Sequence, residues 1–404
     1  MSSLSPGQIM LAAALIFGLA TASQIIAPRL RIPALILLLP AGFLLGLAAP
    51  QFRMDSVLGP AFPVVVDLVV AVILFNGGLE LTSIKLADAD RRIVRRLVWI
   101  GGTLTFLGAA LAAHLILDLS WSIAFMLGAV VIVSGPTVVT PILDFAGLRG
   151  RVRGILQWEG TLLDPIGALV AVVVFQVIRA SGQESVGEAV LNFVGGILVG
   201  VIAAAVGVVL FIAGGRLVKG NDLLGTQVLL GSVIVVAGVA NFLADETGLL
   251  AALLMGMAAP RLARKFGASL DNSQPFFGTL VSIGIGVLFI AIAALVPAAT
   301  VASVLLPTLL FSAFLILVLR PLVVAIGTAR SDLSRKQRVF IASMDPRGIV
   351  APATASSIGA ALIALKVDGA SNLLPIAFIV VAVTVAVYGL CAVPLARALR
   401  LNSD

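Results

Sequence analysis

Cysteine, histidine and charged residues are all scarce in this sequence of 404 residues. It has one cysteine, Cys391, and one histidine, His114, and charged side chains make up 11% of the chain. A single cysteine excludes an intrachain disulfide, and the lack of His and Cys clusters argues against a transition-metal site. No nucleophile and base pair, metal motif or phosphate-binding loop is present, which argues against an enzyme. We therefore expect no catalytic site and no cofactor.

Apolar residues dominate the rest of the chain. Hydrophobic residues make up 60% of it and the mean hydropathy is +1.19, more than a soluble globule can bury. Apolar stretches of about 20 residues are long enough to cross roughly 30 Å of hydrocarbon. Thirteen such stretches begin near residues 8, 33, 60, 97, 121, 153, 187, 223, 247, 275, 302, 335 and 372. The sequence predicts an all-α polytopic membrane protein with 13 transmembrane helices.

Basic residues indicate the orientation of these helices. The net charge of +7 would suit a nucleic-acid partner, but Lys and Arg are divided among short loops between apolar stretches, so we expect no nucleic acid. They gather in the odd-numbered loops, as in the runs from Arg91 to Arg96 and from Arg149 to Arg153, and the even-numbered loops are poor in them. By the positive-inside rule the N-terminus lies outside and the C-terminus in the cytoplasm.

One carboxylate stands in an otherwise apolar stretch. Asp164 lies between residues 155 and 178, near the middle of a predicted helix. A charge at the centre of a bilayer costs between ~3 and ~15 kcal/mol, so a chain rarely keeps one there without a task. Asp164 is therefore the candidate ion or proton site.

Two predicted helices are interrupted by glycine and proline. The interruptions lie at Pro136 and Pro346, and proline removes a backbone donor and clashes with the preceding turn. If the stretch at about 187–215 is a linker, the two interruptions occupy corresponding places in two inverted six-helix repeats. Broken helices at such places indicate a midplane binding site, although ordinary proline kinks are the alternative.

Four segments resemble a known superfamily. They are Ser134 to Thr137, Trp158 to Pro165, Pro346 to Val350, and Leu74 to Leu81. Through them, and along essentially its whole length, the chain resembles the cation/proton antiporter superfamily, particularly bacterial sodium/proton exchangers of the NhaP type. The resemblance implies the NhaA/NapA-like antiporter fold, with inverted repeats and crossed broken helices.

The resemblance also implies an organisation within one transmembrane transporter unit, 1–404. It predicts a homodimer in the bacterial inner membrane, with a dimerisation domain at about 8–82 and 223–296. An ion-translocating core at about 97–180 and 302–397 would move like an elevator, joined by a linker helix at about 187–215. Relatives often carry a cytoplasmic regulatory domain after the last helix, and these 404 residues contain none.

Residue roles follow from the same resemblance. Asp164 takes the role of the aspartate that binds the cation and carries the proton, and Glu159 and Arg347 form a structural ion pair in the core. Asp345 either shares the Arg347 guanidinium or marks the helix break. Apart from the resemblance, Asp67 and Asp345 are candidates for a water-lined funnel, and the alternative for Asp67 is a role in attracting cations. The candidate cation ligands near Asp164 are Ser134, Gly135, Thr137, Gly160 and Thr161.

The chain departs from the family pattern at three positions. Leu163 stands where many relatives have Asn and electrogenic ones a second Asp, so we expect one-for-one, electroneutral exchange. Gly135 and Gly160 replace side chains that carry oxygen, which leaves Na⁺, Li⁺ or K⁺ as the transported ion. We predict Na⁺/H⁺ exchange, with a K⁺/H⁺ antiporter of the same fold as the alternative. A sodium-coupled symporter of organic solutes would need a roomy polar cavity, which the sequence does not indicate.

Overall fold

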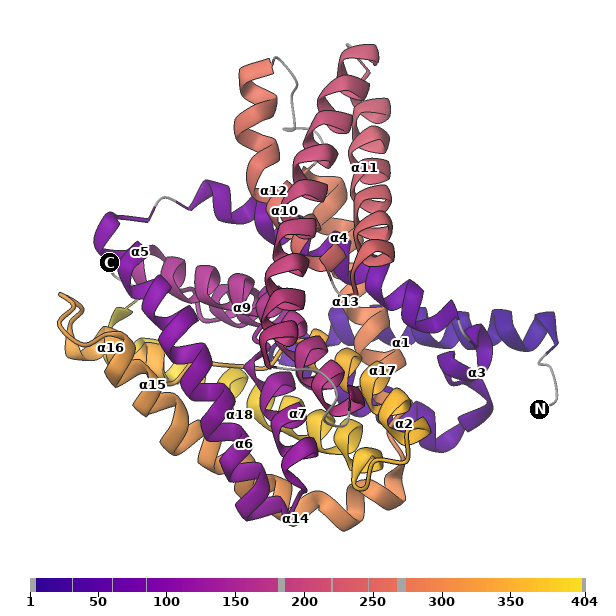
Figure 1. Ribbon diagram of the computed structural model, residues 1–404, viewed down its shortest axis with the longest axis vertical. Coiled ribbons are helices and arrows are strands. Elements are labelled where there is room, and N and C mark those ends of the chain that lie inside the picture. Colours follow the sequence, from indigo (N-terminus) through magenta and orange to yellow (C-terminus); the bar gives the residue numbers. More distant parts are fainter. Residues whose placement is uncertain are drawn as a thin grey trace. The chain divides into compact units, whose positions relative to one another are not determined.

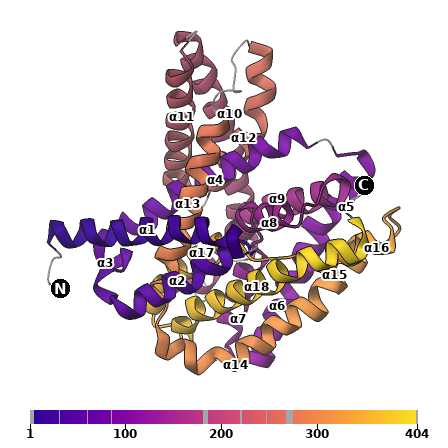
Figure 2. The ribbon, with the colours of Figure 1, turned by 180° about the vertical axis from the view of Figure 1, so that it is seen from behind.

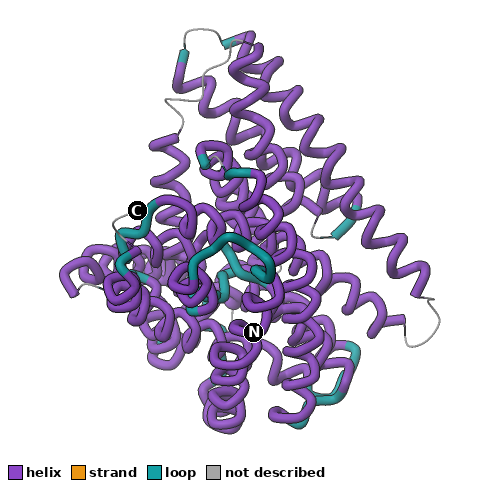
Figure 3. The backbone as a smooth tube through the Cα atoms, turned by 90° about the vertical axis from the view of Figure 1, so that its left-hand side faces the viewer, coloured by secondary structure: helices purple, strands orange, loops and turns teal. Residues whose placement is uncertain are grey.

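The computed structural model describes residues 5–30, 32–59, 61–84, 86–180, 186–218, 221–245, 247–266 and 274–401. Within these residues the chain is built of helices joined by short connections, with no strand (Figure 3). It divides into two compact units, described separately below. Unit 1 comprises Met1–Pro63, Leu86–Gly167 and Gly286–Asp404, and unit 2 comprises Val64–Lys85 and Ala168–Ile285.

Unit 1 holds most of the helices. Helix α6 packs against α7, and α18 packs against both α14 and α17; Figure 2 shows α14 and α18 in this unit. The elements of its first two segments are α1 (Pro6–Leu30), α2 (Leu35–Ala48), η1 (Pro50–Phe52), α3 (Met54–Leu58), α5 (Asp88–Arg96), the π-helical turn η2 (Leu97–Gly101), α6 (Gly102–Leu117), α7 (Trp121–Ile132), α8 (Pro136–Phe145) and the first part of α9 (Gly150–Ala180). Its later elements are the end of α13 (Gln274–Ala293), α14 (Ala298–Phe314), the π-helical turn η3 (Leu315–Leu319), α15 (Arg320–Gly327), α16 (Arg335–Ala342), α17 (Val350–Ala364), η4 (Ala370–Asn372) and α18 (Leu373–Leu399).

Unit 2 is built around three helices that pack against one another (Figure 1). They are α10 (Val186–Leu217), α11 (Asp222–Leu243) and α12 (Thr247–Phe266), and α4 (Ala61–Ser83) lies against α12. A Cβ atom placed on Gly78 of α4 would lie 2.5 Å from the Leu253 carbonyl oxygen. Only glycine allows this approach, and small residues at helix interfaces replace the hydrophobic driving force that is absent between helices in lipid.

The helix lengths fit a membrane protein. Within the described ranges, nine helices are long and apolar enough to cross a bilayer, and four shorter apolar helices accompany them. Each of the stretches predicted from the sequence has a helix, or a pair of helices with a break, at its place. The all-α membrane fold is confirmed, whereas the number of helices that span the bilayer stays a prediction.

The two interrupted helices are broken where the sequence predicts. Helix α7 ends at Ile132 and α8 begins at Pro136, so the chain is not helical from 133 to 135. Proline suits the first position of α8 because a helix has no partner for the backbone donor there. The second break runs from 343 to 349, between α16 and α17, and contains Pro346.

The compact units are defined by packing and differ from the predicted dimerisation and core domains, which stay a prediction. The predicted linker helix corresponds to α10, whose bounds are Val186–Leu217. Unit 1 contains both breaks and the part of α9 that carries Asp164, so the site can be described within this one unit.

Candidate functional site

The two helix breaks meet each other inside unit 1. The Ser134 hydroxyl of the first break donates a hydrogen bond of 3.2 Å to the Pro346 carbonyl oxygen of the second. A Cβ atom placed on Gly348 would lie 2.9 Å from the backbone nitrogen of Gly135. Two segments more than 200 residues apart in the chain are thus in direct backbone contact.

Asp164 lies against this contact. Its side chain is 0% exposed, and neither carboxylate oxygen has a hydrogen-bond partner among the described residues. A Cβ atom on Gly135 would lie 2.7 Å from Oδ2 of Asp164, and one on Gly348 would lie 3.6 Å from Oδ1. Because both positions are glycine, one backbone segment from each break can approach the carboxylate.

The ends of the broken helices give the site its electrostatic character. The N-termini of α8 and α17, at Pro136 and Val350, directly follow the two segments that approach Asp164. Helix N-termini carry partial positive charge and favour a nearby anion. An ionised carboxylate buried without a partner is nevertheless costly, so a proton or a bound cation is needed to neutralise it.

Two buried hydroxyl groups belong to neighbours of this site. Ser134 directly precedes Gly135, whose backbone approaches the carboxylate, and Thr161 lies three positions before Asp164 in α9. Ser134 is 3% exposed and Thr161 is 1% exposed. Each donates its proton to a backbone carbonyl, Ser134 to Pro346 and Thr161 to Gln157 at 2.7 Å, which leaves the oxygen lone pairs for a cation.

The remaining candidate ligands offer no side chain that the structure describes. Gly160 has no side chain to offer, and a Cβ atom there would lie 3.5 Å from the Ser134 carbonyl oxygen. The side chain of Thr137 lies outside the described part of the structure. The ligand set around Asp164 stays a prediction.

Glu159 pairs with an arginine that the sequence interpretation missed. Nη1 and Nη2 of Arg320 donate to the two carboxylate oxygens of Glu159 at 2.6 and 3.0 Å, and both side chains are buried. Nη2 also donates to the carbonyl oxygens of Ile341 and Met344, at 3.1 and 2.9 Å, where α16 ends. The predicted pairing of Glu159 with Arg347 is therefore wrong.

Arg347 instead pairs within its own segment. Its Nη2 donates to Asp345 at 2.7 Å, and Nη1 reaches the carbonyl oxygen of Ile132, the last residue of α7, at 3.5 Å. Asp345 is 6% exposed and also lies 4.0 Å from Nη1 of Arg320. Asp345 therefore shares the guanidinium of Arg347, and its role in a water-lined funnel stays a prediction.

Arg320 carried the same signal as Asp164. It is a lone charge in the apolar stretch that begins near residue 302, and an isolated charge in such a stretch needs a partner or a task. Arg347 lies within a recognisable motif and Arg320 does not, which is why the predicted partner of Glu159 was wrong.

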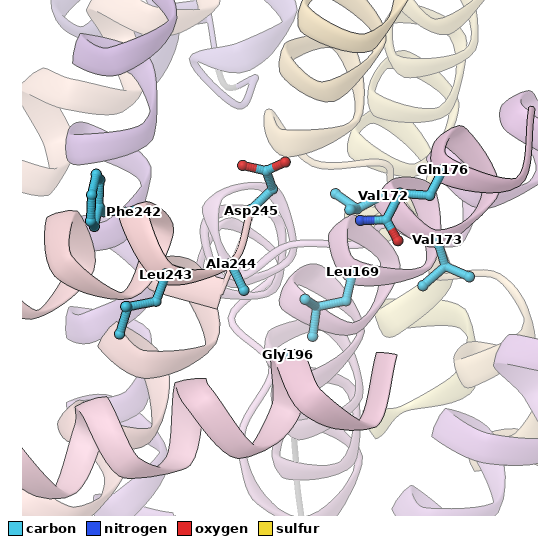
Figure 4. A pocket seen from close by; sticks show the side chains of 9 residues that line it. All are labelled: Leu169, Val172, Val173, Gln176, Gly196, Phe242, Leu243, Ala244 and Asp245. Atoms are coloured by element: carbon cyan, nitrogen blue, oxygen red, sulfur yellow. The ribbon is translucent and has the colours of Figure 1, made fainter. Parts of the chain in front are cut away.

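Asp67 lies in α4, which belongs to unit 2. Its carboxylate lies close enough to Asp245 for the two to repel each other. Asp245 and Gln176 help to line a cavity of about 330 Å³ in the same unit (Figure 4), and the Gln176 amide oxygen is buried without a hydrogen-bond partner among the described residues. Asp67 is not among the lining residues, and its funnel role stays a prediction.

Similarity to known proteins agrees with this architecture. A structure of the sodium proton antiporter MjNhaP1 from Methanocaldococcus jannaschii at pH 8 superposes with a TM-score of 0.81 at 20% identity, covering 98% of this chain and 100% of that one. An electron-microscopy map of the same antiporter gives a TM-score of 0.70 at 19% identity, with 98% and 96% covered. At these identities the likeness establishes the antiporter fold.

Family membership follows from the sequence itself. Residues 11–398 match the family model described as sodium/hydrogen exchanger, transmembrane. A match over nearly the whole chain, with a buried carboxylate where two broken helices meet, leads to one conclusion. The protein belongs to the sodium/hydrogen exchanger family and is a multi-pass membrane antiporter of cations and protons, not an enzyme.

Proposed function

We propose that the protein exchanges Na⁺ for H⁺ one for one, with both ions competing for Asp164. The observation that carries the proposal is the fully buried carboxylate of Asp164, which has no hydrogen-bond partner in the described residues and lies where the two helix breaks meet. A carboxylate in such a place is stable only when a proton or a cation neutralises it. Because one group serves both ions, binding of one displaces the other.

The pairing of the other buried acids supports electroneutral exchange. Among the described residues of unit 1, the buried acids are Asp90, Glu159, Asp164 and Asp345. Asp90 accepts a hydrogen bond from Arg151 at 2.6 Å, and the carboxylates of Glu159 and Asp345 are held by arginines as described above. Only Asp164 is left to exchange its counter-charge. A monovalent cation and a proton then carry equal charge in opposite directions.

A hard monovalent cation suits the groups around Asp164. Carboxylate, hydroxyl and backbone carbonyl oxygens are the ligands that such cations prefer. Ligands of this kind are supplied by Asp164, the hydroxyls of Ser134 and Thr161, and the backbone carbonyl groups of the first break. The K⁺/H⁺ alternative draws support from Gly135 and Gly160, because a shell with few fixed side chains discriminates less by size.

We further propose an elevator movement of the core, in a homodimer with its C-terminus in the cytoplasm. The buried pairs support a core that moves as one body: Arg320 ties α9 to the end of α16, and Arg347 ties the second break to the end of α7. The two carboxylates and two guanidinium groups of these pairs have balanced charge, so they can cross a membrane together at lower cost than any one of them alone.

Proteoliposomes provide the test. Dissipation of a pH gradient is measured on addition of Na⁺, Li⁺ or K⁺, for the wild type and for Asp164→Asn. Asp118→Asn serves as a matched control, because Asp118 is exposed and its left-handed backbone (φ 52°) suits asparagine. We expect exchange to be lost only with Asp164→Asn.

Further measurements in the same assay separate the alternatives. Full exchange by Asp164→Asn would refute the assignment of the site, and cation-dependent uptake of an organic solute would favour a symporter. Repeating the assay with the membrane potential clamped or free tests electroneutrality, since a rate that changes with voltage would mean that net charge is moved. The relative response to Na⁺ and K⁺ decides between the two antiporter alternatives.

A further inference from the structure

The face of α9 that contacts α8 carries a regular stripe of residues. Its members are separated alternately by four and three positions, a spacing that places side chains on one face of a helix. They are Arg153, Gln157, Gly160, Asp164 and Gly167. Asp164 therefore shares its face of α9 with four residues whose contacts fix where α8 lies.

The half of the stripe nearest the α8–α9 turn is polar. Nη1 of Arg153 lies 2.6 Å from Oδ1 of Asp144, and Nε donates to the amide oxygen of Gln157 at 3.2 Å. The Gln157 amide nitrogen in turn donates to the hydroxyl oxygen of Thr140 at 3.3 Å. Four positions separate Thr140 from Asp144 and four separate Arg153 from Gln157, so the two links lie one helical turn apart on both helices.

The other half of the stripe contains two glycines, one on each side of Asp164, that allow close packing of α9 against α8 and the first break. A Cβ atom on Gly160 would lie 3.2 Å from Cγ2 of Val139, and one on Gly167 would lie 2.6 Å from Cγ2 of Val133. The helix and the break that precedes it are therefore in close contact with α9 on both sides of Asp164. Such contacts hold the helices together but specify their relative axial position weakly, because valine side chains offer no directional bond.

We propose that Gln157 is a positioning residue. It sets the axial position of α8 relative to α9 and so places the first break opposite Asp164. The inference rests on the proposal that Asp164 binds the cation. Gln157 is 4% exposed, and its amide is used at both ends, the oxygen by Arg153 and the nitrogen by Thr140. The link between Gln157 and Thr140 is a part-buried, directional contact between α8 and α9, one helical turn closer to Asp164 than the contact of Arg153 with Asp144.

Small displacements matter because the break approaches the carboxylate so closely. One turn of helix corresponds to about 5.4 Å, whereas a Cβ atom on Gly135 would lie only 2.7 Å from Asp164. A shift of a fraction of a turn would thus separate Ser134 and Gly135 from the carboxylate and change cation binding. A role limited to holding the helices together would change the stability of the protein and leave cation affinity unaltered.

The experiment measures the apparent KM for Na⁺, the maximal rate and the pH profile of exchange in proteoliposomes. Gln157→Leu and Thr140→Val each remove the link, and Thr140→Ser retains the hydroxyl. Thr308→Val is the matched control, since Thr308 is 0% exposed and its hydroxyl bonds only within its own helix, to the Val304 carbonyl oxygen. Detergent-solubilised samples are first compared by gel filtration and thermal unfolding.

We expect Gln157→Leu and Thr140→Val to raise the apparent KM roughly fivefold to tenfold, the size of one lost hydrogen bond. The maximal rate per folded protein should fall far less, the half-maximal pH should shift, and Thr140→Ser should restore the KM. An unchanged KM in Thr140→Val, or the same change in Thr308→Val, would overturn the inference. If Gln157→Leu fails to fold, the comparison of Thr140→Val with Thr140→Ser decides.

The Asp164→Asn variant separates this inference from the proposed function. Exchange that persists in Asp164→Asn refutes the cation site itself. Exchange that is lost in Asp164→Asn, together with an unchanged KM in the link variants, refutes only the positioning role of Gln157.

Discussion

Replacing Arg320 with methionine would leave Glu159 as an unpaired buried charge. The two residues form a bidentate pair with distances of 2.6 and 3.0 Å and side chains that are 3% and 4% exposed. Breaking a buried pair by removing one partner typically costs ~3–5 kcal/mol. The Arg320→Met variant would also leave the Met344 carbonyl oxygen without its guanidinium donor at the end of α16, whereas the Ile341 carbonyl oxygen keeps the Met344 backbone N–H at 3.3 Å. We expect the loss to lie at the upper end of that range.

The assay is the free energy of unfolding, measured by titration with a denaturing detergent. The matched control is Arg53→Met, because Arg53 pairs with Asp55 at a comparable 2.7 Å while the side chains are 31% and 41% exposed. An exposed pair of this kind contributes ~0–1 kcal/mol. The variants should therefore differ by several kcal/mol although the two ion pairs have similar lengths.

A double variant distinguishes the charge from the shape of the side chain. Glu159→Gln alone strands Arg320, and adding Glu159→Gln to Arg320→Met removes the buried charge altogether. We expect the double variant to recover part of the stability that Arg320→Met loses, because replacing both members of a buried pair is far less harmful than replacing one. A loss below about 1 kcal/mol in Arg320→Met, or no recovery in the double variant, would refute the reasoning.

Three further perturbations test the site and its surroundings. Arg347→Ala should reduce folding or exchange, because Asp345 would keep only the 4.0 Å contact with Arg320; normal yield and unchanged exchange would contradict this. Gly135→Ala should abolish or severely weaken cation-driven exchange because its Cβ would lie 2.7 Å from Asp164, whereas Gly18→Ala, with nothing within 4 Å, should not. The hydrogen bond from Arg151 lowers the pKa of the Asp332 carboxyl, so its contribution to stability is complete above the unfolded value of about 3.9 and is lost as pH falls through the folded value. Asp332→Asn should thus flatten the dependence of the melting temperature on pH below about pH 4, and an unchanged acid limb would argue against the pair.

The sequence predicts the parts of the site that depend on local chemistry. Proline and glycine together weaken a helix, and they indicated the interruptions at Pro136 and Pro346 without a structure, although Pro165 and Gly167 lie inside α9 without a break. An isolated charge in an apolar stretch is equally local, and it identified Asp164. The bounds of the helices followed the apolar stretches closely for the same reason.

The ion pairs could not be predicted in this way. Glu159 and Arg320 are 161 positions apart, and Arg347 also lies in unit 1, so either arginine was available to Glu159. The choice depends on where α15 places Arg320 relative to α9, which only the assembled helices determine. Asp345 lies two positions before Arg347 and pairs with it locally, and this leaves Glu159 for the more distant arginine.

The arrangement of charge around the breaks supports the proposal that Asp164 exchanges ions. The first half of each broken helix ends in carbonyl groups that carry partial negative charge, and each end receives an arginine: Arg347 reaches the end of α7 and Arg320 the end of α16. These arginines are held at the same time by Asp345 and Glu159.

Both guanidinium groups are thereby committed to carboxylates and carbonyl groups other than those of Asp164. Asp164 faces the opposite polarity, the N-terminal sides of α8 and α17, which favour its negative charge without supplying a counter-ion. A fixed cation at this place would occupy the site permanently, whereas a partial positive charge leaves it open to a proton or a metal cation in turn. The proposed exchange would therefore depend as much on the acids that hold the two arginines elsewhere as on Asp164 itself.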